Sequence, residues 1–252
     1  MYVGDIRGGH ICKGGIHVMS MKTIGLIGGM SWESTLEYYR IINKSVNERL
    51  GGFHSAKIVM YSVEFAEVER LQHAGEWGKL NDLMIDAARR VERGGADCVL
   101  ICTNTMHIMA GDVEKNIDIP LVHIADATAE VIKEKGIARI GLMGTKFTME
   151  KEFYRGRLAS HGLEVIIPQQ DQRETVHGII YDELCQGIIK ESSKDSYRGI
   201  IEEMVRAGAE GIILGCTEIG LLIRDGDASV PIFDTTEIHA KRAVDFALSA
   251  RG

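Results

Sequence analysis

One strand-to-loop sequence occurs twice in this chain, and this repeat constrains the fold more than any other feature. Residues 95–97 (Gly-Ala-Asp) precede an apolar run that opens at Thr103, and residues 208–210 (Gly-Ala-Glu) precede a run that opens at Cys216. The spacing is the same for both pairs (208 − 95 = 113 and 216 − 103 = 113). An apolar run that opens into small polar residues is typical of the C-terminal end of a buried parallel strand. Thr103 therefore corresponds to Cys216.

A second repeat supports a duplicated fold. Residues 140–145 (Ile-Gly-Leu-Met-Gly-Thr) resemble residues 24–29 (Ile-Gly-Leu-Ile-Gly-Gly) at an offset of 140 − 24 = 116 residues. Strand and helix patterns alternate along the chain, which predicts an α/β protein with parallel sheets. We expect two Rossmann-like lobes related by pseudo-twofold symmetry. Because ligands bind at the carboxyl ends of parallel strands, the two polar loops are expected to line one cleft between the lobes.

The expected domain boundaries follow from these repeats. We assign residues 21–124 together with residues 231–252 to the first α/β lobe, and residues 125–230 to the second. Residues 1–20 contain five glycines and no apolar periodicity. They are expected to form a flexible N-terminal extension. A metal-ligand reading of His10, Cys12 and His17 is the alternative there, and we expect no metal.

Charge and cysteine content exclude several classes of protein. The net charge of −7 over 252 residues argues against nucleic acid or an anionic membrane as a partner. No apolar run approaches the roughly 18 residues of a membrane-spanning helix. The five cysteines show neither zinc-site nor disulfide-framework spacing, so reduced thiols in a cytoplasmic enzyme are expected.

The first strand runs into a glycine-containing loop, residues 28–31 (Gly-Gly-Met-Ser). Glycines after a strand let backbone amides approach an anion closely. The loop does not have the GxGxxG pattern, and no acidic residue stands where a ribose would need it, so dinucleotide binding is not favoured.

Three motifs in order give the chain a family resemblance. They are residues 27–31 (Ile-Gly-Gly-Met-Ser), 103–107 (Thr-Asn-Thr-Met-His) and 214–218 (Leu-Gly-Cys-Thr-Glu). With them, residues 21–250 resemble the cofactor-independent aspartate/glutamate racemase superfamily. The resemblance implies two Rossmann-like lobes with the site between them, a homodimer, and racemisation of a small amino-acid substrate without pyridoxal phosphate or another cofactor.

One departure from the family pattern narrows the resemblance. Most members place a cysteine before Asn-Thr in the first loop, whereas this chain has Thr103 there and Cys102 one residue earlier. In this feature the chain resembles a bacterial subgroup of broad or L-selective aspartate/glutamate racemases. It implies glutamate, aspartate or both as substrate, with the L-enantiomer preferred. A lysine that many aspartate racemases carry in the second lobe is replaced by Cys185, which puts the usual side-chain carboxylate recognition in question.

Racemisation requires proton transfer on both faces of the α-carbon, and Cys216 and Thr103 are the expected catalytic pair. A free thiol has a pKa of roughly 8.5, and a helix N-terminus next to Cys216 would lower it. Cys216 is therefore expected to act as the base, by family analogy on the L-enantiomer. A hydroxyl is a far weaker acid, so Thr103 is expected to donate a proton more readily than to remove one.

The substrate-binding residues are expected in the same loops. Backbone amides and hydroxyls near five of them would hold the α-carboxylate: Met30, Ser31, Asn104, Thr105 and Thr217. By the resemblance Gln72 lies at the rim, and Thr145 and Thr148 could bind the other end of the substrate. Glu218 could tune Cys216, bind the substrate ammonium or cap a helix.

Structural alternatives remain open at several positions. Cys216 could be an inert buried thiol, and Thr103 could only cap the segment that starts at Asn104. Cys102 should point away from Thr103 into the core, because successive strand residues face opposite sides. His107 is expected to be structural, bonding a loop carbonyl. The functional alternatives are a decarboxylase or cis-trans isomerase that works through Cys216, or a catalytically idle amino-acid-binding protein.

Overall fold

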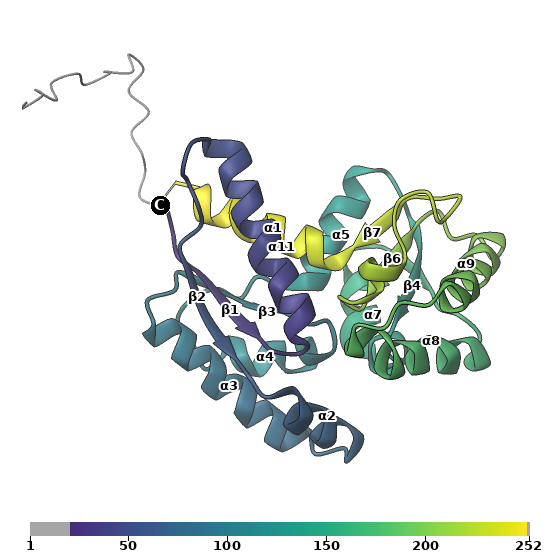
Figure 1. Ribbon diagram of the computed structural model, residues 1–252, viewed down its shortest axis with the longest axis horizontal. Coiled ribbons are helices and arrows are strands. Elements are labelled where there is room, and N and C mark those ends of the chain that lie inside the picture. The colour runs from purple at the N-terminus through teal and green to yellow at the C-terminus, as the bar shows by residue number, and fades with distance from the viewer. Residues whose placement is uncertain (1–20, 251–252) are drawn as a thin grey trace, which may run out of the picture.

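The computed structural model describes residues 21–250. The expected extension over residues 1–20, with its alternative metal ligands His10, Cys12 and His17, lies outside the described residues. Within them the chain forms two α/β lobes that lie side by side (Figure 1).

The first lobe is built on three parallel strands in the order β2-β1-β3. The strands are β1 (Ile24–Gly28), β2 (Ile58–Ser62) and β3 (Cys98–Ile101). The helices between and after them are α1 (Trp32–Leu50), α2 (Phe65–His73), α3 (Trp77–Arg93), η1 (Thr105–Met109) and α4 (Ala110–Glu114). The strands are apolar on both faces because helices cover both. Ile27 and Ile101 pack with α3, whereas Leu26 and Leu100 pack with α1.

The second lobe is built on four parallel strands in the order β5-β4-β6-β7. The strands are β4 (Arg139–Gly144), β5 (Glu164–Ile166), β6 (Ile212–Gly215) and β7 (Ile232–Asp234). The helices of this lobe are α5 (Ile124–Glu134), α6 (Lys146–Glu150), α7 (Glu152–Ser160), α8 (Gln170–Asp182), η2 (Leu184–Gln186), α9 (Glu191–Arg206) and α10 (Ile219–Leu222). Helix α11 (Thr235–Leu248) follows β7. One face of this sheet packs on α8 and α9, and the other packs on α5 and α7.

The strand order repeats between the lobes. In each sheet the first strand in sequence lies between the second and the third, as β2-β1-β3 and β5-β4-β6. The repeated sequences occupy matching positions, since Thr103 and Cys216 follow β3 and β6. The prediction of an α/β protein with two parallel-sheet lobes is confirmed.

Two details differ from the sequence-based expectation. The segment 120–124 has the apolar composition of a strand, but it contributes a single bridge between Leu121 and Val99, and α5 begins at Ile124. Strand β7 pairs with β6, so residues 232–234 lie in the second sheet, whereas the expected boundary assigns residues 231–252 to the first lobe. The lobe change occurs after β7, because α11 returns to pack on α1.

Candidate active site

A small cavity of about 20 Å³ lies where the two lobes meet, at the carboxyl ends of the strands. Residues from both lobes line it: Met30, Phe65, Gln72, Thr103, Asn104, Thr105, Thr145, Ile180, Tyr181, Cys185, Gly215, Cys216 and Glu218. The structure therefore brings together eight of the expected site residues. The other three, Ser31, Thr148 and Thr217, do not line this cavity, but each bonds a residue that does.

Thr103 and Cys216 lie on walls contributed by different lobes. Thr103 follows β3 and Cys216 follows β6, which are the third strands of their lobes, and Cys216 is 8% exposed. Cys102 is fully buried in the core between β1, α1 and α11, on the opposite side of the strand, as its alternating position predicts. The repeat in the sequence thus places a hydroxyl and a thiol at one cavity.

The loop between β1 and α1 places Ser31 at the interface between the lobes. Gly29 has φ +89°, and a Cβ there would lie 2.2 Å from the carbonyl oxygen of Val63, so the turn requires glycine. Ser31 then caps α1 by accepting from the backbone N–H of Ser34 at 3.4 Å. Its hydroxyl donates to Glu218 Oε1 at 2.7 Å, across the lobe boundary.

Glu218 is a buried carboxylate whose hydrogen bonds are all to the protein. It is 2% exposed. Oε1 accepts from the hydroxyl and the backbone N–H of Ser31, at 2.7 and 3.4 Å. Oε2 accepts from the hydroxyl of Thr217 at 2.8 Å and from Sγ of Cys216 at 3.0 Å. Because four donors occupy this carboxylate, the geometry favours tuning of Cys216 over binding of the substrate ammonium.

The structure corrects the electrostatic argument made for Cys216. The expected helix N-terminus belongs to α10, which is four residues long. Burial and the neighbouring Glu218 carboxylate raise the pKa of Cys216 well above its ordinary value. A short helix cannot offset desolvation and a carboxylate in contact with the thiol. Cys216 in this structure is therefore a protonated thiol that donates a hydrogen bond.

Three further hydrogen bonds join the lobes around the cavity. The hydroxyl of Tyr181 donates to Oε1 of Gln72 at 3.1 Å. The hydroxyls of Thr105 and Thr145 lie 3.1 Å apart, and Thr145 also bonds the buried Thr148 at 3.2 Å. The first bond connects α8 to α2, and the second connects η1 to the loop before α6.

Asn104 contributes the third of these bonds and leaves one acceptor unused. Its Nδ2 donates to Oγ1 of Thr235 at 3.0 Å, and that hydroxyl donates to the carbonyl of Leu214 at 2.8 Å. Because Thr235 has its proton committed to Leu214, it must accept from Asn104, which fixes the amide orientation. Oδ1 of Asn104 is buried and has no partner among the described residues.

Four lining residues were not predicted from the sequence, and Cys185 was considered only because of the family resemblance. Phe65, Ile180 and Tyr181 belong to α2 and α8, and Gly215 ends β6. Nothing in the helical periodicity separates a side chain that faces the other lobe from one that faces its own core. The Tyr181 hydroxyl, a polar tip on a largely apolar helix face, is the one local hint.

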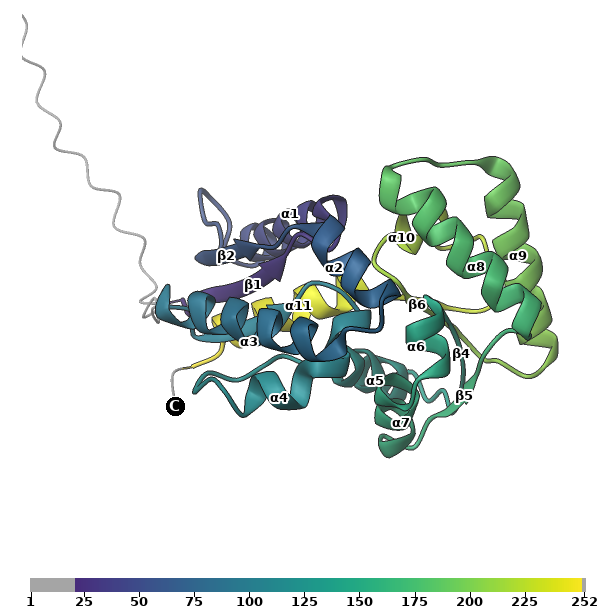
Figure 2. The ribbon, with the colours of Figure 1, turned by 90° about the horizontal axis from the view of Figure 1, so that it is seen from below.

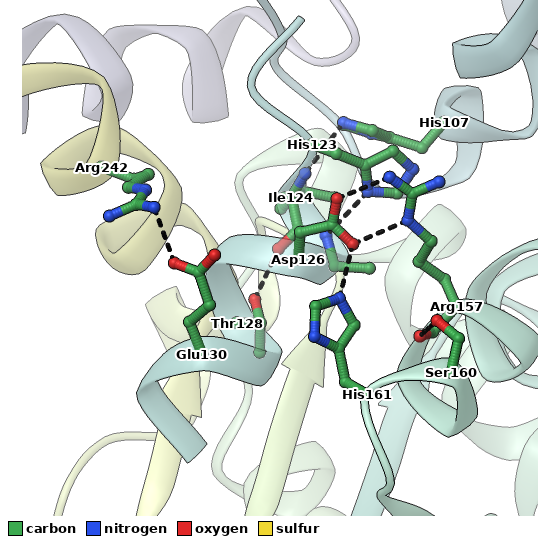
Figure 3. A network of polar contacts seen from close by, with 11 residues as sticks. His107, His123, Ile124, Asp126, Thr128, Glu130, Arg157, Ser160, His161 and Arg242 are labelled. Carbon is green, nitrogen blue, oxygen red and sulfur yellow. Dashed lines mark hydrogen bonds and ion pairs between the residues drawn. The ribbon is translucent and has the colours of Figure 1, made fainter. Parts of the chain in front are cut away.

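His107 bonds a loop carbonyl, as expected, and the carbonyl is that of Thr103, at 2.8 Å from Nδ1. Figure 3 shows the ring next to His123 and the first turn of α5. Within residues 21–250, no group of His, Cys, Asp and Glu side chains is arranged to hold a metal ion. In the same range no helix combines the length and apolar character needed to cross a membrane.

Two solved structures are similar to this chain over most of its length. The crystal structure of a candidate Asp/Glu racemase from Yersinia pestis is 56% identical, with a TM-score of 0.85 over 91% of this chain and all of the other. An aspartate racemase homologue from Pyrococcus horikoshii is 37% identical, with a TM-score of 0.79 over 91% of this chain and all of the other.

A curated relative and a family profile agree with the structures. The broad specificity amino-acid racemase RacX of Bacillus subtilis is 23% identical over 171 residues, which are 68% of this chain and 74% of the relative. The profile of the Asp/Glu/hydantoin racemase family matches residues 27–243, which include both lobes and the loops that hold Thr103 and Cys216. The chain belongs to the Asp/Glu/hydantoin racemase family.

Proposed function

We propose that this protein racemises an amino acid without a cofactor, by proton transfer on both faces of the α-carbon with Cys216 and Thr103. The proposed substrates are glutamate, aspartate or both, with the L-enantiomer preferred. Family membership supports amino-acid racemisation. The observation that carries the residue assignment is that the thiol and the hydroxyl line the same cavity from different lobes.

The proton inventory of the site suggests how the pair works. For an L-substrate, Sγ takes the α-proton, the electron pair stays on the α-carbon, and Oγ1 of Thr103 returns a proton from the other side. Thr103 then regains a proton from solvent, and the proton that Sγ gave to Glu218 leaves to solvent. Sγ must first lose its own proton, and Glu218 Oε2 is the acceptor to which it is hydrogen-bonded. The substrate ammonium favours this loss, because a positive charge near a thiol lowers its pKa. In the reverse direction the thiol already carries the proton that it donates.

Asn104 is proposed to bind the α-ammonium group. From the sequence, Asn104 was expected to hold the α-carboxylate, and one of its two N–H donors is already committed to Thr235. The remaining Oδ1 is an unpartnered buried acceptor on a residue that lines the cavity. A buried acceptor without a partner costs about 1–3 kcal/mol, and a substrate N–H would relieve that cost.

The proposal is tested by α-proton exchange in deuterated water, with L- and D-enantiomers of glutamate, aspartate and neutral amino acids. We expect Cys216→Ser to abolish exchange of the preferred L-enantiomer, because a serine hydroxyl is a poor base. Thr103→Cys should let the opposite enantiomer exchange, because a thiol then stands on its face. Full exchange by Cys216→Ser would show that the base is misassigned.

The same panel separates the alternatives. A decarboxylase or cis-trans isomerase would leave the α-proton unexchanged and would turn over malonate-like or maleate-like acids. A catalytically idle protein would bind an amino acid, measured by calorimetry, without any exchange. Either outcome replaces the racemase proposal.

A further inference from the structure

A buried histidine holds the backbone of the residue that we assign to one face of the substrate. His107 is 2% exposed and lies one turn after Thr103. Its Nδ1 lies 2.8 Å from the carbonyl oxygen of Thr103, and its Nε2 lies 3.2 Å from the backbone nitrogen of Ile124. The second contact is drawn in Figure 3.

These two contacts fix the protonation pattern of the ring. A backbone N–H can only donate, so Nε2 must accept from Ile124 and carries no proton. The proton of the neutral ring is therefore on Nδ1, where it donates to Thr103. Burial, followed by the neighbouring His123, holds the pKa of His107 well below its ordinary value, so the ring stays neutral.

The bond from His107 completes the restraint of Thr103 on both sides. The backbone N–H of Thr103 donates to the carbonyl of Ile101 at 2.8 Å, and its carbonyl accepts from His107. Fixing both peptide groups of a residue fixes its φ and ψ, and with them the direction of the Cα–Cβ bond. The direction in which the Thr103 hydroxyl is presented thus depends on the His107 ring.

The ring is itself held by the connection between the lobes. Ile124 is the first residue of α5 and is buried in the core of the second lobe. The rings of His123 and His239 lie 4.7 and 5.6 Å from the His107 ring, edge to face. His107 therefore connects the backbone of Thr103 to Ile124, the first residue of the second lobe's helix α5.

We infer that His107 is a positioning residue for Thr103, which orients the hydroxyl toward the α-carbon through the Thr103 carbonyl and sets it relative to the lobe that carries Cys216. The inference rests on the proposed function, in which Thr103 transfers a proton. It predicts that loss of the bond to Thr103 slows the proton transfer on the Thr103 face and leaves the Cys216 step intact.

Two substitutions separate the two hydrogen bonds of the ring. In His107→Asn the amide nitrogen can occupy the place of Nδ1 and still donate to Thr103, whereas the bond to Ile124 is lost. In His107→Gln the amide oxygen can occupy the place of Nε2 and still accept from Ile124, whereas the bond to Thr103 is lost. His239→Gln is the matched control, because His239 belongs to the same buried cluster but bonds Tyr38 and Val122.

The measurement is the primary isotope effect on kcat/KM with α-deuterated L- and D-substrate. Label in the D-enantiomer reports the Thr103 step, and label in the L-enantiomer reports the Cys216 step. If the Thr103 step slows, it limits the rate more, so the D-isotope effect rises and the L-isotope effect falls toward one. An isotope effect is a ratio of rates, so it does not depend on how much of a variant is folded.

We expect His107→Gln to lower kcat/KM by about 10- to 100-fold, the range expected when a reacting group is misplaced by about 1 Å. In the same variant the isotope effect with the D-substrate should rise, and that with the L-substrate should fall toward one. His107→Asn and His239→Gln should keep the wild-type isotope effects. Unchanged isotope effects in His107→Gln would overturn the inference. Undiminished racemisation by Thr103→Val would instead overturn the proposed function, so the two failures are distinguishable.

Discussion

At the scale of single residues, the protonation state of Cys216 is set by its contact with Glu218. The carboxylate lies 3.0 Å from Sγ and shares its burial. Both burial of the thiol and the neighbouring Glu218 charge favour the neutral thiol. Under the proposed function, Cys216 therefore stays neutral until a substrate changes the local charge.

Glu218→Gln should lower the pKa of Cys216 relative to wild type, because the substitution removes the negative charge that opposes the thiolate. The measurement is a pH titration of the thiolate ultraviolet absorbance. Subtracting the same titration of Cys216→Ser isolates this thiol from the other cysteines. A thiol pKa that stays the same or rises in Glu218→Gln would contradict the electrostatic role assigned here.

The sequence could predict most of the polar residues that meet at the cavity, but not the protonation state of Cys216. The repeat places Thr103 and Cys216 at equivalent strand ends, and two parallel lobes then bring those ends together. The helix after Cys216 was expected to stabilise a thiolate, but its length and the direction of the Glu218 side chain depend on tertiary packing. The hydrogen bond between Ser31 and Glu218 joins residues 187 positions apart, and no local pattern encodes it.

At the scale of secondary-structure elements, α2 and α8 close the cavity from opposite lobes. Figure 2 shows α2 at the edge of the first lobe that faces the second. The Tyr181 hydroxyl bonds Gln72, and the Tyr181 ring lies 5.3 Å from His73 and 4.8 Å from His177. A cavity of about 20 Å³ holds about one water molecule. An amino acid can therefore bind only after these walls separate.

Tyr181→Phe should weaken the closed arrangement, because it removes the hydrogen bond between α8 and α2 and keeps the ring. A neutral hydrogen bond contributes about 1 kcal/mol and must break before an amino acid can bind, so we expect KM to fall about fivefold in steady-state racemisation assays. Tyr197→Phe is the control, since its hydroxyl bonds the carbonyl of Val176 within the second lobe, at 3.3 Å. An equal change of KM in both variants would argue against a specific role for the α2–α8 contact.

The elements themselves were largely predictable, and the exceptions have physical causes. Alternation of buried strands and amphipathic helices identifies both sheets. The segment 120–124 has the apolar composition of a strand, yet α5 begins at Ile124 and leaves a single bridge. Strand β7 is three residues long and runs directly into α11, so its lobe is decided by pairing with β6 and not by its own sequence.

At the scale of the whole molecule, buried neutral histidines link stability to pH. Burial lowers the pKa of His123 to about 4 and that of His239 to about 3, and it lowers the pKa of His107 as well. In the unfolded chain a histidine titrates near 6.5. Between that pH and the folded pKa values the unfolded state binds more protons, so acid favours unfolding. The stability that these histidines contribute is complete above the unfolded pKa and declines as the pH falls.

The free energy of unfolding should therefore decrease as the pH falls from 6.5 toward 4, by up to about 1.4 kcal/mol per pH unit for each buried histidine. Urea unfolding at a series of pH values measures it. His123→Gln should flatten the slope in this window, whereas His54→Gln, at an exposed position, should not. A slope that is the same in all three proteins would show that His123 is not responsible.

Asp126 adds a separate loss at lower pH. Arg157 binds it through two bonds of 2.6 Å, and His161 through one of 2.9 Å (Figure 3). Burial opposes ionisation of this carboxyl, but these bonds outweigh burial and lower its pKa to about 2. Its contribution is present above the unfolded pKa of about 3.9 and is lost as the pH falls to about 2. The histidine window and the carboxylate window therefore do not overlap strongly.

The return of α11 has a consequence for synthesis on the ribosome. Ala240, Ala243 and Val244 fill the core of the first lobe beside Tyr38 and Ile42, although they follow the strands of both sheets in the sequence. The nascent first lobe therefore lacks the part of its core that α11 supplies until α11 is made, whereas the second sheet can already form once β7 is made. Cotranslational folding should run in the reverse of gene order, with the earliest-made half protected from protease last.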